Sequence, residues 1–178
     1  MDRVSALSLK DFTAFDEARF DFSPGINVLI GANATGKSHV MKVVYSVLQT
    51  ARRFQLHGSS SGVPGNPLEV MLGEKLHGVF KPDGRIGRLV KRAQGRKHAE
   101  VRVQFNHERF SFELTTLDRL MVPEPASPEI GECLFLPTRE LLSMYPGFIA
   151  AYRDRELSFD ETYYDLCVAL SAAPLRGP

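Results

Sequence analysis

The sequence has 178 residues, of which 43% are hydrophobic and 24% charged, as expected for one globular domain. The formal net charge of +1 excludes a general electrostatic attraction to nucleic acid or membranes, so such a partner would need a local patch. Cys133 and Cys167 lack the spacing of a zinc or redox motif, and no apolar run approaches the roughly 20 residues that span a bilayer. Because no signal-peptide pattern is seen either, we expect a cytoplasmic protein with reduced thiols and no membrane partner.

The first elements in chain order are predicted to be strands. Residues 4–12 form one strand, and residues 17–22 form a second in which Ala18, Phe20 and Phe22 alternate with charged residues. The short connection predicts a hairpin. Residues 26–30 are a nearly continuous apolar run, which is typical of a strand buried on both faces. From Lys37 to about Phe54 the apolar residues recur at helical spacing.

The rest of the chain alternates between loops, helices and one clear hairpin. Residues 57–67 and 122–131 are rich in turn-forming residues and are predicted to be loops. Strict alternation predicts a hairpin of strands at 99–105 and 110–114, and Cys133 to Leu136 reads as a short apolar strand. Helices are predicted at 68–81, 85–93, 139–145, 148–156 and 158–173, the last one capped by Ser158 or Asp160.

One segment carries recognisable chemistry, a match to the P-loop pattern GxxxxGK[ST]. It lies between the apolar run and the amphipathic helix, the context that this motif requires. Its glycines let backbone N–H groups form a nest around phosphate oxygens, and the following helix directs its positive end at the same anion. The residues predicted to bind nucleotide are Gly31, Ala32, Asn33, Ala34, Thr35, Gly36, Lys37, Ser38 and, next to the loop, His39.

The pattern assigns roles within the loop. Lys37 is predicted to reach the β- and γ-phosphates as the catalytic cation, and the Ser38 hydroxyl to bind Mg²⁺. ATP, or a closely related nucleoside triphosphate, and Mg²⁺ are therefore the expected ligands. The five histidines are scattered, and none is assigned to a metal.

The stretch LKDFTAFDEARFDFSPGINVLIGANATGKSHVMKVV resembles the N-terminal lobe of ABC-type ATPases of the RecF/SMC/OLD-like group. In that group a β-hairpin precedes a strand of the form GxNxLIGxNxxGKS. The resemblance implies an α/β P-loop NTPase fold, an ABC-ATPase-like N-terminal lobe with antiparallel β-hairpins beside a P-loop strand and helix. It also places Lys10 and Phe12 where relatives contact the base or ribose, although Phe12 fits a core position equally well.

Later segments extend the resemblance. CLFLPTRELLSMYPGF is similar to the strand and Q-loop of these ATPases, with Thr138, Arg139 and Glu140 where the family has a glutamine. An ordinary helix start, with Thr138 as N-cap and Glu140 in the first turn, explains the same residues equally well. YRDRELSFDETYYDLCVAL is similar to a helical segment of bacterial AAA-family ATPases.

The resemblance implies a partial ABC-type ATPase domain over residues 1–178. Its expected parts are a hairpin, P-loop and helix (4–54), a helical and β-hairpin insertion (55–131), and a Q-loop-like strand with helices (132–178). The sequence contains no hydrophobic strand ending in Asp-Glu (Walker B), no signature motif and no switch histidine. We therefore expect the N-terminal half of an ATPase, from a fragment, a truncated gene or a split protein, that is inactive alone.

The family implies function and partners beyond ATP. Its members act in DNA metabolism or defence, and ATP closes a dimer of two copies. Here the missing C-terminal lobe or a second copy is the expected partner. Residues 85–98 contain six Lys or Arg and no acid, with Arg85, Arg88 and Arg92 predicted on one helix face. This segment is either a DNA-binding patch or an ordinary solvated face.

Three other functions remain open at this point. A non-hydrolysing nucleotide-binding regulatory module uses the same P-loop without a general base. A small-molecule P-loop kinase is disfavoured by the antiparallel strands ahead of the loop. A transporter ATPase subunit is disfavoured by the long insertion and the SMC-like N-terminus.

Overall fold

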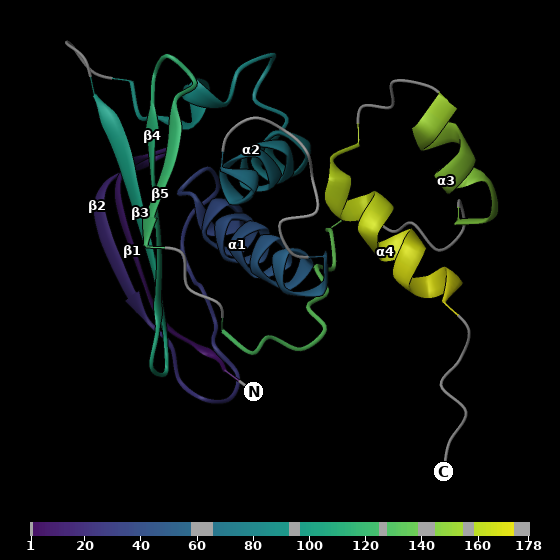
Figure 1. Cartoon of the computed structure of the whole chain (residues 1–178), viewed down its shortest axis with the longest axis horizontal. Helices are drawn as coiled ribbons and strands as arrows, with labels where there is room; N and C mark the ends of the chain where they lie inside the picture. Colours follow the sequence, from purple (N-terminus) through teal and green to yellow (C-terminus); the bar gives the residue numbers. More distant parts are fainter. Residues whose placement is uncertain are drawn as a thin grey trace. The chain divides into compact units, whose positions relative to one another are not determined.

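The computed structural model of the protein describes residues 2–57, 66–92, 97–124, 128–138, 145–154 and 159–172. The chain forms two compact units, Met1–Cys133 and Leu134–Pro178, which are described separately (Figure 1). None of the described helices has the length and apolar character needed to cross a membrane.

The first unit is built on a five-stranded sheet in which every neighbouring pair is antiparallel, in the order β2-β1-β3-β4-β5. The strands are β1 (Val4–Phe12), β2 (Phe15–Asp21), β3 (His98–Phe105), β4 (Arg109–Thr115) and β5 (Leu120–Glu124). Both predicted hairpins, β1–β2 and β3–β4, are confirmed. Long-range pairing of β1 with β3 joins them into one sheet.

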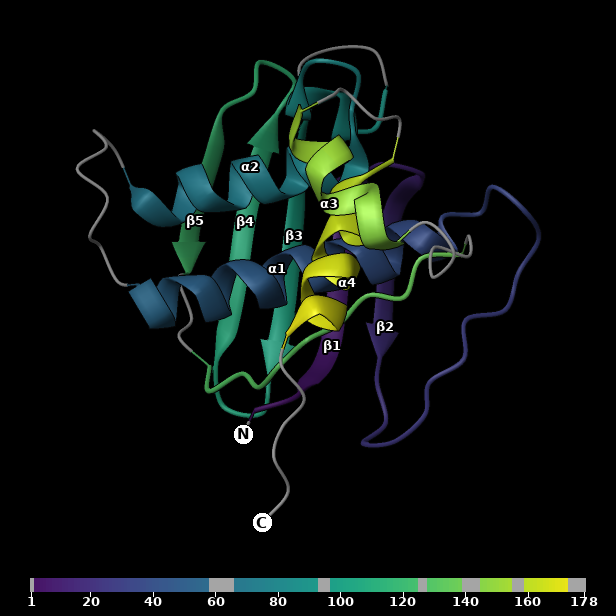
Figure 2. The ribbon, with the colours of Figure 1, turned by 90° about the vertical axis from the view of Figure 1, so that its right-hand side faces the viewer.

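Two helices, α1 (Lys37–His57) and α2 (Pro67–Phe80), lie across one face of this sheet (Figure 2). Helix α2 begins where the sequence places its start signals: the Asn66 side chain accepts a hydrogen bond from the Leu68 N–H at 3.1 Å, and Pro67 occupies the first turn. It ends at Lys81, whose φ of 45° is left-handed. The predicted helix at 68–81 is thereby confirmed within one residue.

The core lies between the sheet and the two helices. Alternate residues of β1, β3 and β4 meet apolar residues of α1 and α2 there, and Phe12 contacts Phe80 and Phe112 edge to face, with ring centroids 5.8 and 6.2 Å apart. The fully buried large side chains are Phe12, Phe105, Phe110, Phe112, Leu7, Leu9, Leu72, Leu76, Leu114, Val43, Val47 and Val79. This core fixes α1, which the P-loop enters, and β1, which is joined to β2 by a short turn.

The described residues of the second unit include two helices, α3 (Tyr145–Asp154) and α4 (Glu161–Ser171), which pack through aromatic side chains. Asp160 caps α4 by accepting a hydrogen bond from the Thr162 N–H at 3.0 Å, which confirms one of the two predicted caps. The predicted break at Pro146-Gly147 is wrong, because both residues lie inside the first turn of α3, where proline is tolerated. Of the helix predicted at 139–145, residues 139–144 lie outside the described residues, and Tyr145 is the first residue of α3.

Four other predictions are corrected. Residues 26–30 and 133–136 form no strand, since no described strand pairs with either segment. Leu120–Glu124, predicted to belong partly to a loop, is strand β5; its Pro123 is tolerated because β5 is an edge strand. Of the helix predicted at 85–93, only the 3-10 turn η1 (Ile86–Leu89) is formed.

Candidate nucleotide-binding loop

The P-loop connects the irregular segment 26–30 to the first turn of α1. Gly36 has a φ of +93° and Ala34 a φ of +63°, so the backbone turns through left-handed conformations just before the helix begins at Lys37. The Thr35 hydroxyl donates to the Ala32 carbonyl at 2.9 Å and closes the loop on itself. The first four N–H groups of a helix have no intrahelical acceptor, and the first turn of α1 contains no acidic side chain to compete for them.

Lys37 folds back over this loop. Its ammonium group donates to the carbonyls of Gly31, at 2.7 Å, and Ala32, at 2.5 Å. The cation therefore lies against the first two carbonyls of the loop, and the P-loop pattern predicts that it reaches the β- and γ-phosphates of a bound nucleotide. Ser38 follows on the first turn of α1 with an exposed side chain. The Lys37 ammonium and the N–H groups of the first turn are suitable donors for a phosphate group, and the Ser38 hydroxyl oxygen is a suitable ligand for its magnesium ion.

The β1–β2 turn contacts the P-loop directly, which the sequence did not reveal. A Cβ placed on Gly36 would lie 2.7 Å from Cζ of Phe15 and 3.4 Å from Cβ of Ala14. Only glycine fits at position 36 for two independent reasons, the positive φ and this close approach.

His39, which we predicted to belong to the site, lies on the core side of α1. Its ring centroid is 5.6 Å from that of Phe80, and its buried Nδ1 has no hydrogen-bond partner among the described residues. Burial lowers the pKa of His39, and the charge of Lys42 lowers it further. A neutral imidazole packed against Phe80 is a structural group, so the structure gives its side chain no ligand-facing role.

Of the residues taken from the Q-loop resemblance, only Thr138 is among the described residues. Thr138 is exposed and belongs to the second unit. Arg139 and Glu140 lie outside the described residues. The assignment of these three residues stays a prediction.

Lys10 and Phe12 are on opposite faces of the sheet. Phe12 is fully buried against Phe80, so of the two alternatives for this residue the core position is confirmed. The Lys10 side chain is on the face that α1 and α2 leave open, 3.5 Å from Oε1 of Glu100. Glu100 also accepts from Arg102 at 2.9 Å, and its pKa is lowered by hydrogen bonds and the neighbouring cations despite the opposing effect of burial.

The basic segment 85–98 is partly neutralised by acids from elsewhere in the chain. Arg88 pairs with Asp83 at 2.6 Å, and Lys91 and Lys97 pair with acidic residues of the β1–β2 hairpin. The predicted common helix face of Arg85, Arg88 and Arg92 is wrong, because η1 ends at Leu89. The sequence of the segment could not show that its charges are partly neutralised, because all of the acidic partners lie outside residues 85–98.

The segment before the P-loop exposes an apolar stripe. Ile26, Val28 and Ile30 are 91%, 73% and 92% exposed, while Leu29 packs against the core. Contiguous exposed apolar side chains promote association. We expect replacement of all three by threonine to weaken self-association, with the dissociation constant about tenfold higher when measured by sedimentation velocity. The control is Leu117→Thr, which removes a single leucine, 74% exposed, in the β4–β5 turn. Equal association of the two variants would contradict a role for the stripe.

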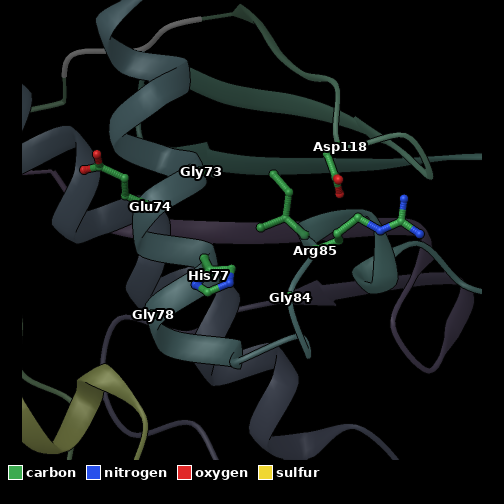
Figure 3. Close-up of a pocket in the computed structure, with 8 residues that line it drawn as sticks. Gly73, Glu74, His77, Gly78, Gly84, Arg85 and Asp118 are labelled. Atoms are coloured by element: carbon green, nitrogen blue, oxygen red, sulfur yellow. The ribbon is translucent and has the colours of Figure 1, made fainter. Parts of the chain in front are cut away.

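A separate hollow of about 480 Å³ lies between α2 and the segment around η1 (Figure 3). Glu74 and His77 come from α2, and Arg85 and Asp118 from the opposite side. Figure 3 shows the Glu74 and Arg85 side chains extending in opposite directions, so the charged groups do not converge on one ligand position. Among the described residues no cluster of His, Cys, Asp or Glu is arranged to hold a metal ion.

Sequence comparisons place this geometry beside known proteins. No protein-family model matches the chain. Stretches of it are similar to proteins named DNA replication and repair protein RecF: that of Oenococcus oeni is 45% identical over 49 residues, covering 28% of this chain and 13% of the relative. That of Salinibacter ruber is 33% identical over 84 residues (39% and 20%), and that of Limosilactobacillus fermentum 29% identical over 106 residues (60% and 24%). The chain thus matches no more than about a quarter of the length of these relatives.

Among solved structures, one from work on ATP-driven dimerisation and DNA-stimulated activation of SMC ATPases aligns with 97% of this chain and 93% of its own, at 17% identity and a TM-score of 0.46. A likeness of this size does not by itself establish function. The RecF similarities confirm the resemblance to the RecF/SMC/OLD-like group that the P-loop region implied. The mixed α/β fold, with antiparallel hairpins beside the P-loop and its helix, agrees with it.

Proposed function

We propose that this chain binds Mg-ATP through residues 31–38, as the nucleotide-binding part of a RecF/SMC/OLD-like ATPase. The observation that carries the proposal is the position of the Lys37 ammonium, held 2.7 Å from the Gly31 carbonyl over a loop that enters α1 through Gly36. A triphosphate would exchange these two carbonyl contacts for phosphate oxygens, which are stronger acceptors for an ammonium group. Backbone N–H groups of the loop and of the first turn of α1 would complete the cradle.

Ser38 is the residue that would hold Mg²⁺ through its hydroxyl oxygen. The ion would neutralise charge between the β- and γ-phosphates when it is bound. The sequence supplies no Walker B acid, and the P-loop alone contains no group to activate water. The proposal for these residues is therefore binding and orientation of the nucleotide, without turnover by this chain alone. Hydrolysis would use groups from a C-terminal lobe or a second copy, closed on the site by ATP.

The proposed setting is DNA metabolism or defence, because the relatives are named as DNA replication and repair proteins. Among the described residues of the basic segment, Arg85 and Arg92 are exposed and would be available to meet a phosphate backbone. A non-hydrolysing regulatory module, which would use the same P-loop to bind nucleotide, is the second candidate. Failure to hydrolyse ATP after a C-terminal lobe is supplied would select it.

The test of the proposal is calorimetric titration with ATP in the presence and absence of Mg²⁺, using the wild-type chain and Ser38→Ala. We expect the substitution to weaken Mg-ATP binding about tenfold, the effect of one lost ligand contact to a charged group. Binding of ATP without Mg²⁺ should not change. A wild-type chain that is folded by circular dichroism and binds no nucleotide would refute the proposal.

A further inference from the structure

The β1–β2 turn is pressed against the P-loop at its most constrained residue. Phe15 and Ala14 occupy the space beside Gly36, the residue with a φ of +93° that precedes the first turn of α1. The Phe15 ring is itself held edge to face against Phe20, with centroids 5.8 Å apart. Any movement of the turn therefore changes the packing that confines the left-handed conformation of Gly36.

The turn is anchored in place by the last residue of η1 and by the segment that follows it. The Thr13 N–H donates to the Leu89 carbonyl at 2.7 Å, and the Lys91 N–H donates to the Asp11 carbonyl at 2.7 Å. Asp11 and Thr13 have positive φ values of 48° and 50°. Left-handed residues of this kind are retained only where surrounding contacts hold them. The turn thus depends on chain segments almost eighty residues away in the sequence.

Two side-chain pairs add to this anchoring. The Lys91 ammonium donates to Asp16 at 2.6 Å and to the Ala14 carbonyl at 3.3 Å, and the Lys97 ammonium donates to Asp11 at 2.7 Å. The Asp11 side chain is only 15% exposed, so its pair with Lys97 is shielded from water. The hydrogen bond from Lys91 lowers the pKa of Asp16, and the hydrogen bond to Asp11 raises the pKa of Lys97. The two pairs, Lys91 with Asp16 and Lys97 with Asp11, are called the turn brace below.

We propose that Lys91 and Lys97 are positioning residues for the nucleotide site, which hold the β1–β2 turn, and through Phe15 the conformation of Gly36, in the form that receives phosphate. The inference rests on the proposed nucleotide binding but concerns residues outside the P-loop pattern. It gives part of the basic segment a role that needs no external partner. The lysines act on the loop only through the turn.

Hydrogen exchange followed by mass spectrometry on the full chain tests the brace without nucleotide. Lys91→Met removes the pair with Asp16 and the contact to the Ala14 carbonyl. We expect amide exchange to become about fivefold faster in peptides covering 13–16 and 31–38, because the turn loses its tie to Lys91 and opens more often. The matched control is Arg88→Met, which removes an equally short ion pair, with Asp83, that does not touch the turn. Unchanged exchange at 31–38 in Lys91→Met would overturn the inference.

A charge exchange separates positioning from a general loss of stability. Lys91→Asp alone should accelerate exchange at 31–38, and Asp16→Lys added to it should restore most of the protection. Asp16 suits this exchange because it is 78% exposed, whereas Asp11 has a left-handed backbone that favours Asp. Equal exchange in the single and double variants would also overturn the inference.

Titration of Mg-ATP into the same variants links the brace to binding. Lys91→Met should weaken binding about fivefold with Arg88→Met unchanged. If the wild-type chain binds no ATP, the proposed function is refuted. If exchange at 31–38 is still faster in Lys91→Met than in the wild type, the structural role of the turn brace stands. If Lys91→Met and the wild type bind ATP with equal affinity, Lys91 is not a positioning residue for the nucleotide site.

Discussion

Replacement of Lys37 by alanine is expected to weaken Mg-ATP binding by about 100-fold. The ammonium group has two contacts in the loop, to the Gly31 and Ala32 carbonyls, and would transfer them to two phosphate groups. A hydrogen bond to a charged group contributes about 1.5–3 kcal/mol, and about 2.7 kcal/mol corresponds to 100-fold in affinity. The measurement is calorimetric titration of Mg-ATP into both proteins.

A loss of binding through unfolding is not expected. Both contacts of the ammonium group are exposed, so their removal should change the free energy of unfolding by less than about 1 kcal/mol. Arg53→Ala is the matched control, because Arg53 is an exposed cation on the same helix, remote from the loop in sequence. Equal weakening in Arg53→Ala would point to general electrostatic attraction of ATP. Full affinity in Lys37→Ala would contradict the assignment of the loop.

The P-loop itself could be predicted because its chemistry is local. Glycine at 36, lysine at 37 and serine at 38 follow directly in the sequence, and the start of α1 lies within the same few residues. Helix α2 was predictable for the same reason: Asn66 and Pro67 carry the start signal in two adjacent positions. The β3–β4 hairpin was read from strict alternation over its two strands.

The errors share a different cause, which is dependence on partners distant in the sequence. An apolar run such as 26–30 becomes a strand only when another strand pairs with it, and no described strand does so. Strand β5 was missed because Pro123 indicates a loop, and only the sheet order reveals that β5 is an edge. The pairing of Lys97 with Asp11 could not be predicted either, because the two residues are eighty-six positions apart in the sequence.

The site shows the same division between local and long-range features. The pattern named the residues that would touch nucleotide, but it placed His39 among them, and its ring packs against Phe80 instead. It also gave no sign that Phe15 is against Gly36. The groups that would bind phosphate were therefore visible in the sequence, whereas the groups that hold them in place required the fold.

Substitution of Gly36 by alanine is expected to abolish detectable Mg-ATP binding, a loss of about 100-fold or more. Two costs add at this position. An L-residue at a φ of +93° is strained by about 1–3 kcal/mol, and its Cβ would lie 2.7 Å from Cζ of Phe15. Relief of either cost rotates the Gly36–Lys37 peptide, so both the backbone cradle and the lysine would be misdirected.

Gly84→Ala separates the two costs. Gly84 has a φ of +91°, and a Cβ placed there meets nothing within 4 Å, so this substitution introduces only backbone strain. We expect a decrease of about 1 kcal/mol in the free energy of unfolding by urea for Gly84→Ala, with unchanged affinity for Mg-ATP. Gly36→Ala combined with Phe15→Ala should recover part of the binding lost in Gly36→Ala, because the collision is removed while the strain stays. If the double variant binds no better than Gly36→Ala, backbone strain alone accounts for the loss, and the contact between the β1–β2 turn and the P-loop is not what makes glycine necessary.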